Sequence, residues 1–271
     1  MSRGENRPKV IIRHGKEALE LSRQALAAAV TRDIRGKRVL IKPNIGFKAG
    51  PKSGIVTNPE VVAGAVRWAE EAGAGEILVG DSCIYGVDSE EAFASSGILE
   101  AAEDEGASVV HLDRGEPVKH KVPDPVILES IKISSIADEA DIIVSVPVVK
   151  SHMHTGATLS LKNMKGILYR RQKMKMHHLG HPDENGPWGR WHTLDLAVSD
   201  LATTVPPHAA LLDATVVLEG MGPMIGEPRR LDTLIASQDP LAADLAVEVG
   251  GDLVEFVEVV RIHPGRLHLP A

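Results

Sequence analysis

The sequence lacks several features that would place it in a specialised class of protein. It has one cysteine, Cys83, which excludes an intramolecular disulfide, a thiolate zinc site and a cysteine-ligated iron–sulfur cluster within this chain. Any metal ion would need histidine or carboxylate ligands. The sequence has no run of eighteen apolar residues, and its first eight residues lack the apolar core of a signal peptide. We therefore expect a cytoplasmic protein with no membrane partner.

Aromatic residues and positive charge are also scarce. The chain has two Tyr, three Phe and three Trp, and its formal net charge is −7. Few stacking platforms and a negative charge argue against nucleic acid as the partner. The sequence contains no Gly-x-x-x-x-Gly-Lys-Ser/Thr, Gly-x-Ser-x-Gly or His-Glu-x-x-His motif. Their absence removes P-loop nucleotide hydrolysis, α/β-hydrolase chemistry and zincin proteolysis from the leading hypotheses.

Strand and helix patterns alternate along the chain. Aliphatic runs predict strands at 9–13, 38–41, 76–79, 108–112, 142–146, 209–218 and 233–237. Amphipathic patterns predict helices at 15–32, 57–73, 134–140, 191–204 and 239–249, and two short helices divided near Gly97 within 89–106. Residues 118–121 and 127–133 predict a hairpin or edge. Because strands that alternate with helices need right-handed crossovers, we expect a mostly parallel, Rossmann-like α/β sandwich of three layers.

We expect one α/β domain over residues 1–271. No repeat, low-complexity segment or long linker divides the chain. An irregular insertion rich in His, Lys and Arg is predicted at about residues 163–192. Nothing in the sequence decides whether the protein forms a homodimer.

Positive charge is concentrated in one stretch. Between Ile142 and Pro182 there is no Asp or Glu, but there are seven Lys and Arg residues and five His residues, including His181. Because the whole chain carries −7, the remainder sums to −14. A solvated basic face normally carries interspersed acidic residues, and this stretch does not. We therefore expect a bound anion to offset the charge.

Polar side chains follow three of the predicted strands. In an open parallel sheet, ligands bind outside the carboxyl ends of the strands, so residues scattered in sequence should converge there. The predicted catalytic residues are Lys150, His152 and His154, and the predicted substrate-binding residues are Lys42, Asn44, Thr57, Asp81, Ser82, Lys162, Asn163 and Lys165. By the same rule, we expect Asp213 and residues Glu219 to Gly222 at a strand end in the second half of the chain.

Several of these motifs also fit a purely structural role. Lys42-Pro-Asn44 fits a strand-ending turn as well as a ligand site, Gly80-Asp-Ser82 fits an Asx turn, and Thr57-Asn-Pro59 fits a helix N-cap. Only one of His177 and His178 can face a given site. Lys150-Ser-His-Met-His154 favours a site, because its two histidines project to one side of an extended segment. That pair would suit a divalent metal ion or a substrate oxygen.

Taken together, the motifs resemble the domain-of-unknown-function family numbered 362. They are Val39-Leu-Ile-Lys-Pro-Asn44, Thr57-Asn-Pro59, Ile77-Leu-Val-Gly-Asp-Ser82, Val146-Pro-Val-Val-Lys-Ser-His152, Thr158-Leu-Ser-Leu-Lys-Asn-Met-Lys-Gly166, Glu219-Gly-Met-Gly-Pro223 and Ala236-Ser-Gln-Asp-Pro240. Many members of that family carry an iron–sulfur module, which a chain with one cysteine lacks. A more distant likeness is to the amino-terminal half of nickel-dependent lactate racemases. As a fold-level analogy, it implies 2-hydroxy acid chemistry by His and Lys.

Two functions from different classes remain open. The first is an enzyme, an isomerase or oxidoreductase, that acts on a small carboxylate or phosphate. Lys42, Lys150 and Lys162 would clamp the anion, His152 or His154 would act as general acid or base, and Asp81 would orient a His or help bind a metal. The second is a non-catalytic metal- or redox-partner binding module that lacks the cluster domain. Single-stranded nucleic-acid binding through residues 162–178 is a third, less favoured class.

Overall fold

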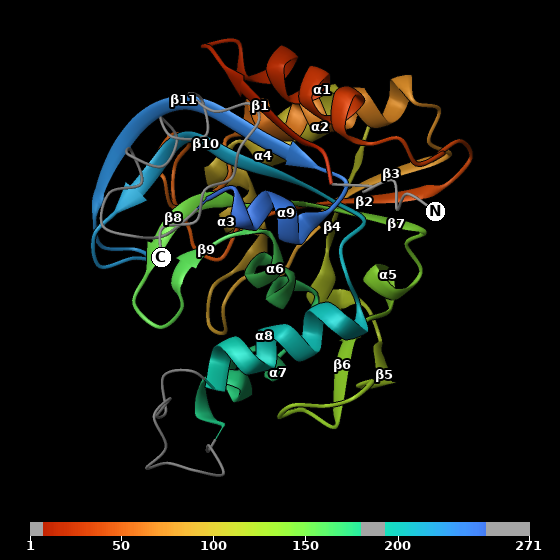
Figure 1. Ribbon diagram of the computed structural model, residues 1–271, viewed down its shortest axis with the longest axis vertical. Helices are drawn as coiled ribbons and strands as arrows, with labels where there is room; N and C mark the ends of the chain where they lie inside the picture. Colours follow the sequence, from red (N-terminus) through yellow and green to blue (C-terminus); the bar gives the residue numbers. More distant parts are fainter. Residues whose placement is uncertain (1–7, 180–192, 248–271) are drawn as a thin grey trace, which may run out of the picture.

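The computed structural model describes residues 8–179 and 193–247 (Figure 1). Its strands are β1 Val10–His14, β2 Arg38–Pro43, β3 Glu76–Asp81, β4 Ser108–His111, β5 Pro117–Lys121, β6 Ser130–Ser134, β7 Ile142–Val146, β8 Val148–His152, β9 Gly156–Thr158, β10 Ala209–Glu219 and β11 Glu227–Ser237. Its α-helices are α1 Ala18–Ala29, α2 Pro59–Glu71, α3 Ser89–Ser96, α4 Ile98–Asp104, α5 Ser135–Asp138, α6 Ser160–Asn163, α7 Gln172–Lys175, α8 Thr193–Thr204 and α9 Pro240–Leu245.

The main sheet is mostly parallel, as the sequence predicts. Its strand order is β1-β11-β10-β7-β2-β3-β4. The strands β10, β7, β2, β3 and β4 pair in parallel, whereas β11 is antiparallel to both β10 and β1. The predicted hairpin is also present, because β5 and β6 pair as a separate two-stranded sheet.

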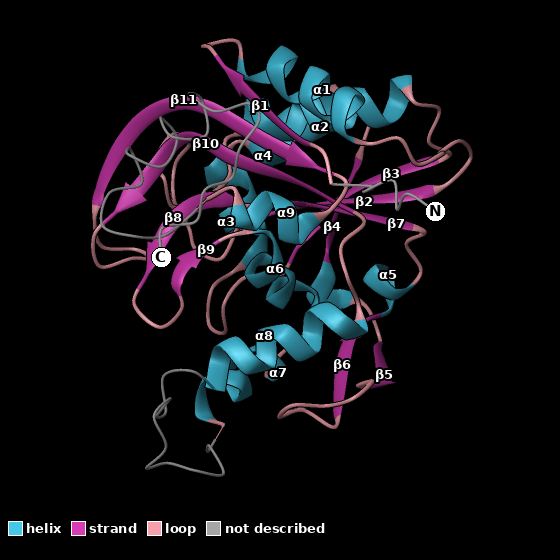
Figure 2. Cartoon of the chain, in the orientation of Figure 1, coloured by secondary structure: helices cyan, strands magenta, loops and turns pink. Residues whose placement is uncertain are grey.

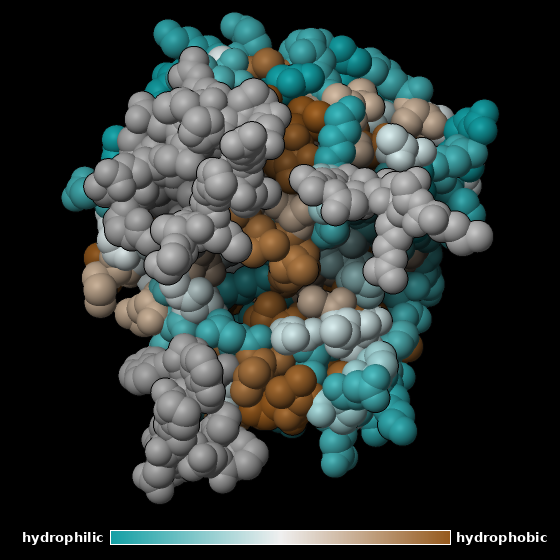
Figure 3. Space-filling view, viewed as in Figure 1, coloured by the Kyte–Doolittle hydropathy of each residue, from teal (hydrophilic) through white to brown (hydrophobic). Residues whose placement is uncertain are grey.

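Helices cover both faces of this sheet and complete the three layers (Figure 2). On one face, α1, α2, α3 and α4 bury apolar residues such as Leu26, Val62 and Phe93 in a core cluster with β2, β3 and β7. On the other face, α5 and α8 pack with residues 164–176 around Ile143 and Leu40. On the face shown in Figure 3, apolar side chains of the described residues lie down the middle and polar ones along the outer edges.

The strand that ends at Val146 restarts after one residue. Pro147 interrupts it, because proline has no backbone N–H for the ladder. Both pieces run parallel to β10: β7 pairs with its start, and β8 pairs with its later residues. After this break the chain continues past the carboxyl end of β7, and there β8 and β9 form a hairpin.

Several predicted boundaries differ from the structure. β11 begins at Glu227 rather than at residue 233, because its exposed polar first half is held by backbone pairing with β10. Helix α9 ends at Leu245, and residues 248–249 of its predicted range lie outside the described residues. The predicted insertion begins with short helical turns at Met164–Ile167, Gln172–Lys175 and Met176–His178. Its later part, residues 180–192 with His181, also lies outside them. No helix within 8–179 and 193–247 is both long and apolar enough to span a bilayer.

Candidate functional site

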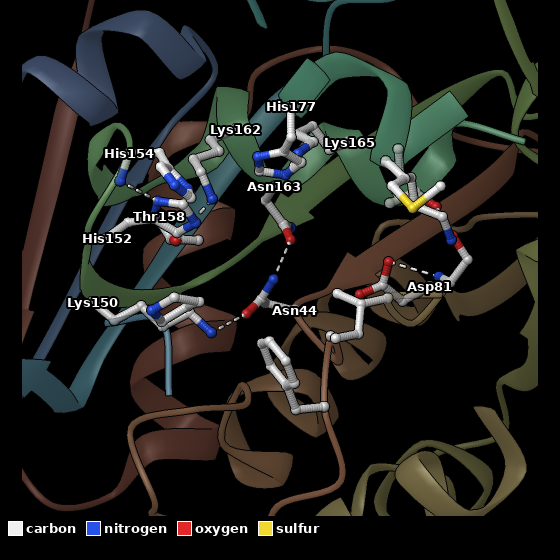
Figure 4. A pocket seen from close by; sticks show the side chains of 18 of the residues that line it. Asn44, Asp81, Lys150, His152, His154, Thr158, Lys162, Asn163, Lys165 and His177 are labelled. Atoms are coloured by element: carbon white, nitrogen blue, oxygen red, sulfur yellow. Dashed lines mark hydrogen bonds between the residues drawn. The ribbon is translucent and has the colours of Figure 1, made fainter. Parts of the chain in front are cut away.

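A cavity of about 400 Å³ lies at the carboxyl ends of β2 and β3 (Figure 4). The chain reaches it from these two strands, from the β8–β9 hairpin, from α6 with the turn after it, and from α7. Ten of the eleven predicted site residues line it: Lys42, Asn44, Asp81, Ser82, Lys150, His152, His154, Lys162, Asn163 and Lys165. Residues that lie more than 120 positions apart in the sequence therefore meet in one cavity. This agrees with the expectation that polar residues at the carboxyl ends of parallel strands converge.

A buried ion pair forms one part of the cavity floor. The Lys42 ammonium donates to Asp81 Oδ1 at 2.7 Å, and both side chains are shut off from solvent. Asp81 also accepts from the backbone amides of Ile45 and Ser82, but not from the amide two residues on that an Asx turn would use. Gly166 packs directly against the pair, because a Cβ there would lie 2.0 Å from Asp81 Oδ1. Burial lowers the pKa of Lys42 and the charge of Asp81 opposes this shift.

Two asparagines connect this pair to Lys150. The Asn163 amide oxygen accepts from Lys42 Nζ at 3.2 Å and from Asn44 Nδ2 at 3.1 Å. Asn44 Oδ1 in turn accepts from Lys150 Nζ at 2.7 Å, and Lys150 also donates to the Ile55 carbonyl. Burial lowers the pKa of Lys150 to about 7. Neutral oxygens therefore orient this ammonium group but leave its charge unbalanced.

Two further lysines face the cavity from the segment that begins at α6. The Lys162 ammonium lies 3.3 Å from Thr158 Oγ1, and Lys165 Nζ lies 2.6 Å from His177 Nε2. Burial, together with the neighbouring ammonium groups, lowers the pKa of Lys162 well below its usual range and that of Lys165 to about 8. In the part of the chain that the structure describes, Lys150, Lys162 and Lys165 form no ion pair with a carboxylate.

The His152 ring is held in one tautomer. The backbone N–H of His154 donates to His152 Nδ1 at 3.1 Å, so the proton of the neutral ring sits on Nε2. Burial and then the charge of Lys162 lower the pKa of His152 to about 2. The imidazole is therefore a neutral hydrogen-bond donor at physiological pH. The His154 ring follows at 5.6 Å between centroids, and His177 lies 5.5 Å beyond His154.

Two predicted residues have structural roles outside the cavity. Thr57 accepts from the Asn44 backbone N–H and donates to the Val146 carbonyl, which ties β2, β7 and the start of α2 together. Asp213 lies within β10, where it is buried and accepts from the backbone amides of Asn58 and Thr215. Asn58, rather than Thr57, caps α2, since its side chain accepts from the Glu60 amide.

Within the described residues, His152 and His154, the predicted metal ligands, do not belong to a larger group of potential ligands. Residues 8–179 and 193–247 contain no group of three or more His, Cys, Asp or Glu side chains that could hold a metal ion. Lys162 adjoins the pair formed by His152 and His154, and its ammonium group would repel a cation. Asp81 is occupied by Lys42, Ile45 and Ser82 and does not bridge to a histidine. The donor set therefore fits an anion better than a divalent metal.

Sequence reasoning did not include Thr158, Lys173 or His177 among the site residues, although all three line the cavity. Lys173 donates to Ser82 Oγ at 2.6 Å and pairs with Asp113 at 3.2 Å. His177 lines the cavity and His178 does not, as expected for adjacent residues on one helical turn. The absence of acidic residues from this stretch was the available signal for Lys173 and His177. It does not identify which of many basic side chains turn inward.

Comparisons with known proteins agree with this fold. A family model described as "Domain of unknown function (DUF362)" matches residues 39–247. The thylakoid-associated protein sll1697 of Synechocystis sp. is 29% identical over 212 residues, which are 78% of this chain and 62% of that protein. This chain therefore spans less than two thirds of the length of that relative.

Two solved structures share the architecture. The lactate racemase apoprotein from Thermoanaerobacterium thermosaccharolyticum matches 92% of this chain and 60% of its own, with a TM-score of 0.57 and 12% identity. A crystal structure of a Thermotoga maritima protein matches the same shares, with a TM-score of 0.50 and 16% identity. At these identities the likeness shows the fold alone. It agrees with the resemblance to lactate racemases predicted from the sequence.

Proposed function

This chain belongs to the DUF362 family, and we propose that it is an enzyme acting on a small carboxylate- or phosphate-bearing metabolite by Lys and His acid–base chemistry. One observation carries the proposal. Lys150, Lys162 and Lys165 line a single cavity, and among the described residues none of the three pairs with a carboxylate. Because concentrated positive charge destabilises the folded chain, a bound anion would relieve the repulsion.

The floor offers donors suited to a carboxylate or phosphate. Lys150 and Lys162 supply ammonium groups, Thr158 supplies a hydroxyl, and His152 supplies an Nε2–H fixed by the bond at Nδ1. Charge-assisted hydrogen bonds to an anion are stronger than bonds between neutral groups. Binding would also raise the depressed pKa of each lysine, because a nearby negative charge favours the ammonium form.

Lysine is the better candidate for the general base. With a pKa of about 7 for Lys150 and about 8 for Lys165, a fraction of each amine is deprotonated near neutral pH. His152 has a pKa of about 2 and accepts a backbone hydrogen bond at Nδ1, so it would donate to a developing negative oxygen instead. This reverses the division of roles expected from the sequence, in which lysines bind and a histidine takes the proton.

The cavity favours a small molecule over nucleic acid. The ammonium groups without a carboxylate partner face a half-open pocket of about 400 Å³ rather than an extended groove that a polymer backbone could follow. The structural neighbour that is a lactate racemase apoprotein puts 2-hydroxy acids first among the candidates. We place the reaction in the cytoplasm, where such metabolites are abundant.

Thermal unfolding of the full chain with a panel of anions tests the proposal. We expect a 2-hydroxy carboxylate or a phosphate ester to raise the melting temperature in a concentration-dependent way, because a ligand that binds only the folded state stabilises it. Lys162→Met should abolish the shift. Lys119→Met is the matched control, because Lys119 is an exposed lysine of β5 outside the cavity. If the Lys162 variant binds the anion as tightly as wild type does, the proposal is contradicted.

Turnover separates an enzyme from a binding module. Proton exchange at the carbon next to the carboxylate can be followed by NMR in deuterated water with the acid that binds best. We expect exchange with wild type and its loss in Lys150→Met. Tight binding without exchange or any other conversion would favour the non-catalytic alternative.

A further inference from the structure

We propose that the ligand of this cavity is an amphiphilic acid, with an anionic head on the lysine-rich floor and an apolar or aromatic tail at the mouth. This inference rests on the proposed function and narrows its substrate class. The anionic head follows from the charges described above. The tail follows from the side chains that surround the opening.

Six apolar side chains surround the mouth of the cavity. They come from five separate segments: the loop after β2, the loop after β3, the β8–β9 turn, α7 and the β10–β11 loop. The residues are Phe47, Ile84, Tyr85, Met153, Met174 and Pro223. The β8–β9 turn is joined to the β10–β11 loop by a hydrogen bond of 3.0 Å from the Met153 amide to the Gly222 carbonyl. Two of the five segments are therefore joined at the mouth.

Several of these side chains are exposed to solvent. The exposed fractions are 44% for Ile84, 60% for Tyr85, 54% for Met153 and 42% for Met174. Single exposed apolar residues are common, but a cluster at the opening of a cavity marks a binding surface. The chain has only two Tyr and three Phe, and one of each lines this cavity.

The floor and the mouth differ in chemistry. Lys42, Asp81, Lys150, His152 and Asn163 are all buried on the floor. At the mouth, the Tyr85 hydroxyl is engaged by Arg171, whose guanidinium also lies 5.1 Å from the Tyr85 ring centroid. An apolar tail would cover the exposed rings and thioethers without leaving a polar group unpaired. Methionine side chains adapt to tails of different shape.

The size of the cavity also favours a ligand with an apolar tail. Its volume of about 400 Å³ falls within the range of roughly 300–1,000 Å³ that holds drug-sized ligands. A three-carbon acid or a phosphate ion would occupy the floor and leave the mouth filled with water. A longer acid would displace that water from apolar surface, which is favourable.

Calorimetric titration with straight-chain 2-hydroxy carboxylates of increasing length tests the inference. At fixed pH and ionic strength, the full chain should bind each homologue about three- to fourfold more tightly than the one before it, until the mouth is filled. Affinity that stays flat or falls with length would overturn the inference while leaving the proposed function intact. If acids of every length and inorganic phosphate all fail to bind, the proposed function fails with it.

Substitutions at the mouth locate the tail. Met153→Ser and Met174→Ser should each reduce the gain per methylene and leave the affinity for the shortest acid within about twofold of wild type. Val126→Ser is the matched control, because Val126 is 58% exposed and does not line the cavity. If both Met variants keep the full gain in affinity per methylene, the tail binds elsewhere and the inference is overturned.

Discussion

The Lys42 ammonium lies 2.7 Å from the Asp81 carboxylate, and neither side chain is more than 2% exposed. The two residues sit on adjacent parallel strands, β2 and β3, 39 positions apart in the sequence. Water cannot compensate either charge, so each depends on the other. Lys42 therefore orders the floor through Asp81 and Asn163, and the unbalanced charge that would attract an anion belongs to Lys150, Lys162 and Lys165.

Breaking this pair should destabilise the protein. Asp81→Asn would leave Lys42 buried without a counter-charge, and we expect the free energy of unfolding to fall by about 3–5 kcal/mol. Asp113→Asn is the control, because Asp113 pairs with Lys173 at a partly exposed site and should cost less than about 1 kcal/mol. Urea denaturation measures both. If Asp81→Asn and Asp113→Asn lower the free energy of unfolding by equally small amounts, the Lys42–Asp81 pair does not stabilise the fold.

Gly166 should tolerate no side chain. A Cβ at this position would lie 2.0 Å from Asp81 Oδ1 and 2.5 Å from Lys42 Nζ. We expect Gly166→Ala to lower the free energy of unfolding by about 1–3 kcal/mol and to weaken anion binding, because the floor must shift. Gly50→Ala is the matched control, since a Cβ there meets nothing within 4 Å. Chemical denaturation that fails to separate the two variants would contradict this packing.

Anion affinity should fall as the pH rises through neutrality. Lys150 and Lys165 have pKa values of about 7 and about 8 in the free protein, so they are largely protonated below pH 7 and lose their charge above it. A bound anion raises both values, and the protein should therefore take up protons on binding at about pH 8. Calorimetry in two buffers of different ionisation enthalpy measures that uptake. Net proton release at this pH would oppose the assignment.

His152 should stay neutral across the physiological range. Its pKa of about 2 keeps the ring neutral, and the hydrogen bond from the His154 amide to Nδ1 favours the Nε2–H tautomer. In ¹⁵N NMR spectra of the full chain, we expect the shifts of this ring to stay constant between about pH 5 and 8 and to show a protonated Nε2. A titration within that interval would mean that the ring is more solvated than its burial implies.

The sequence was most informative about what lies at the ends of parallel strands. Runs such as 38–41 and 76–79 predict strands, and the alternation with helices predicts their common direction. Lys42, Asn44, Asp81 and Ser82 are therefore expected at one edge before any contact is known. The structure places all four on the cavity. The same rule was wrong for Asp213, because β10 continues for six residues past it, to Glu219.

What the sequence could not supply is the pairing of individual side chains. The contact between Lys42 and Asp81 depends on the register of β2 against β3, and no local pattern encodes that register. Likewise, the first half of β11 has no apolar alternation and becomes a strand through backbone pairing with β10. Lys173 and His177 turn inward because short helical turns fold over the cavity, and hydrophobic periodicity does not predict such turns.

The most direct measurement is calorimetric titration of the full chain at pH 7 with the best ligand of the anion panel, for wild type, Lys162→Met and Lys119→Met. If the unpaired ammonium groups form the binding site, wild type and the Lys119 variant will bind with equal affinity and the Lys162 variant at least tenfold more weakly. Equal affinity in all three proteins, or no carboxylate or phosphate bound by wild type, would contradict the assignment of this cavity as an anion site.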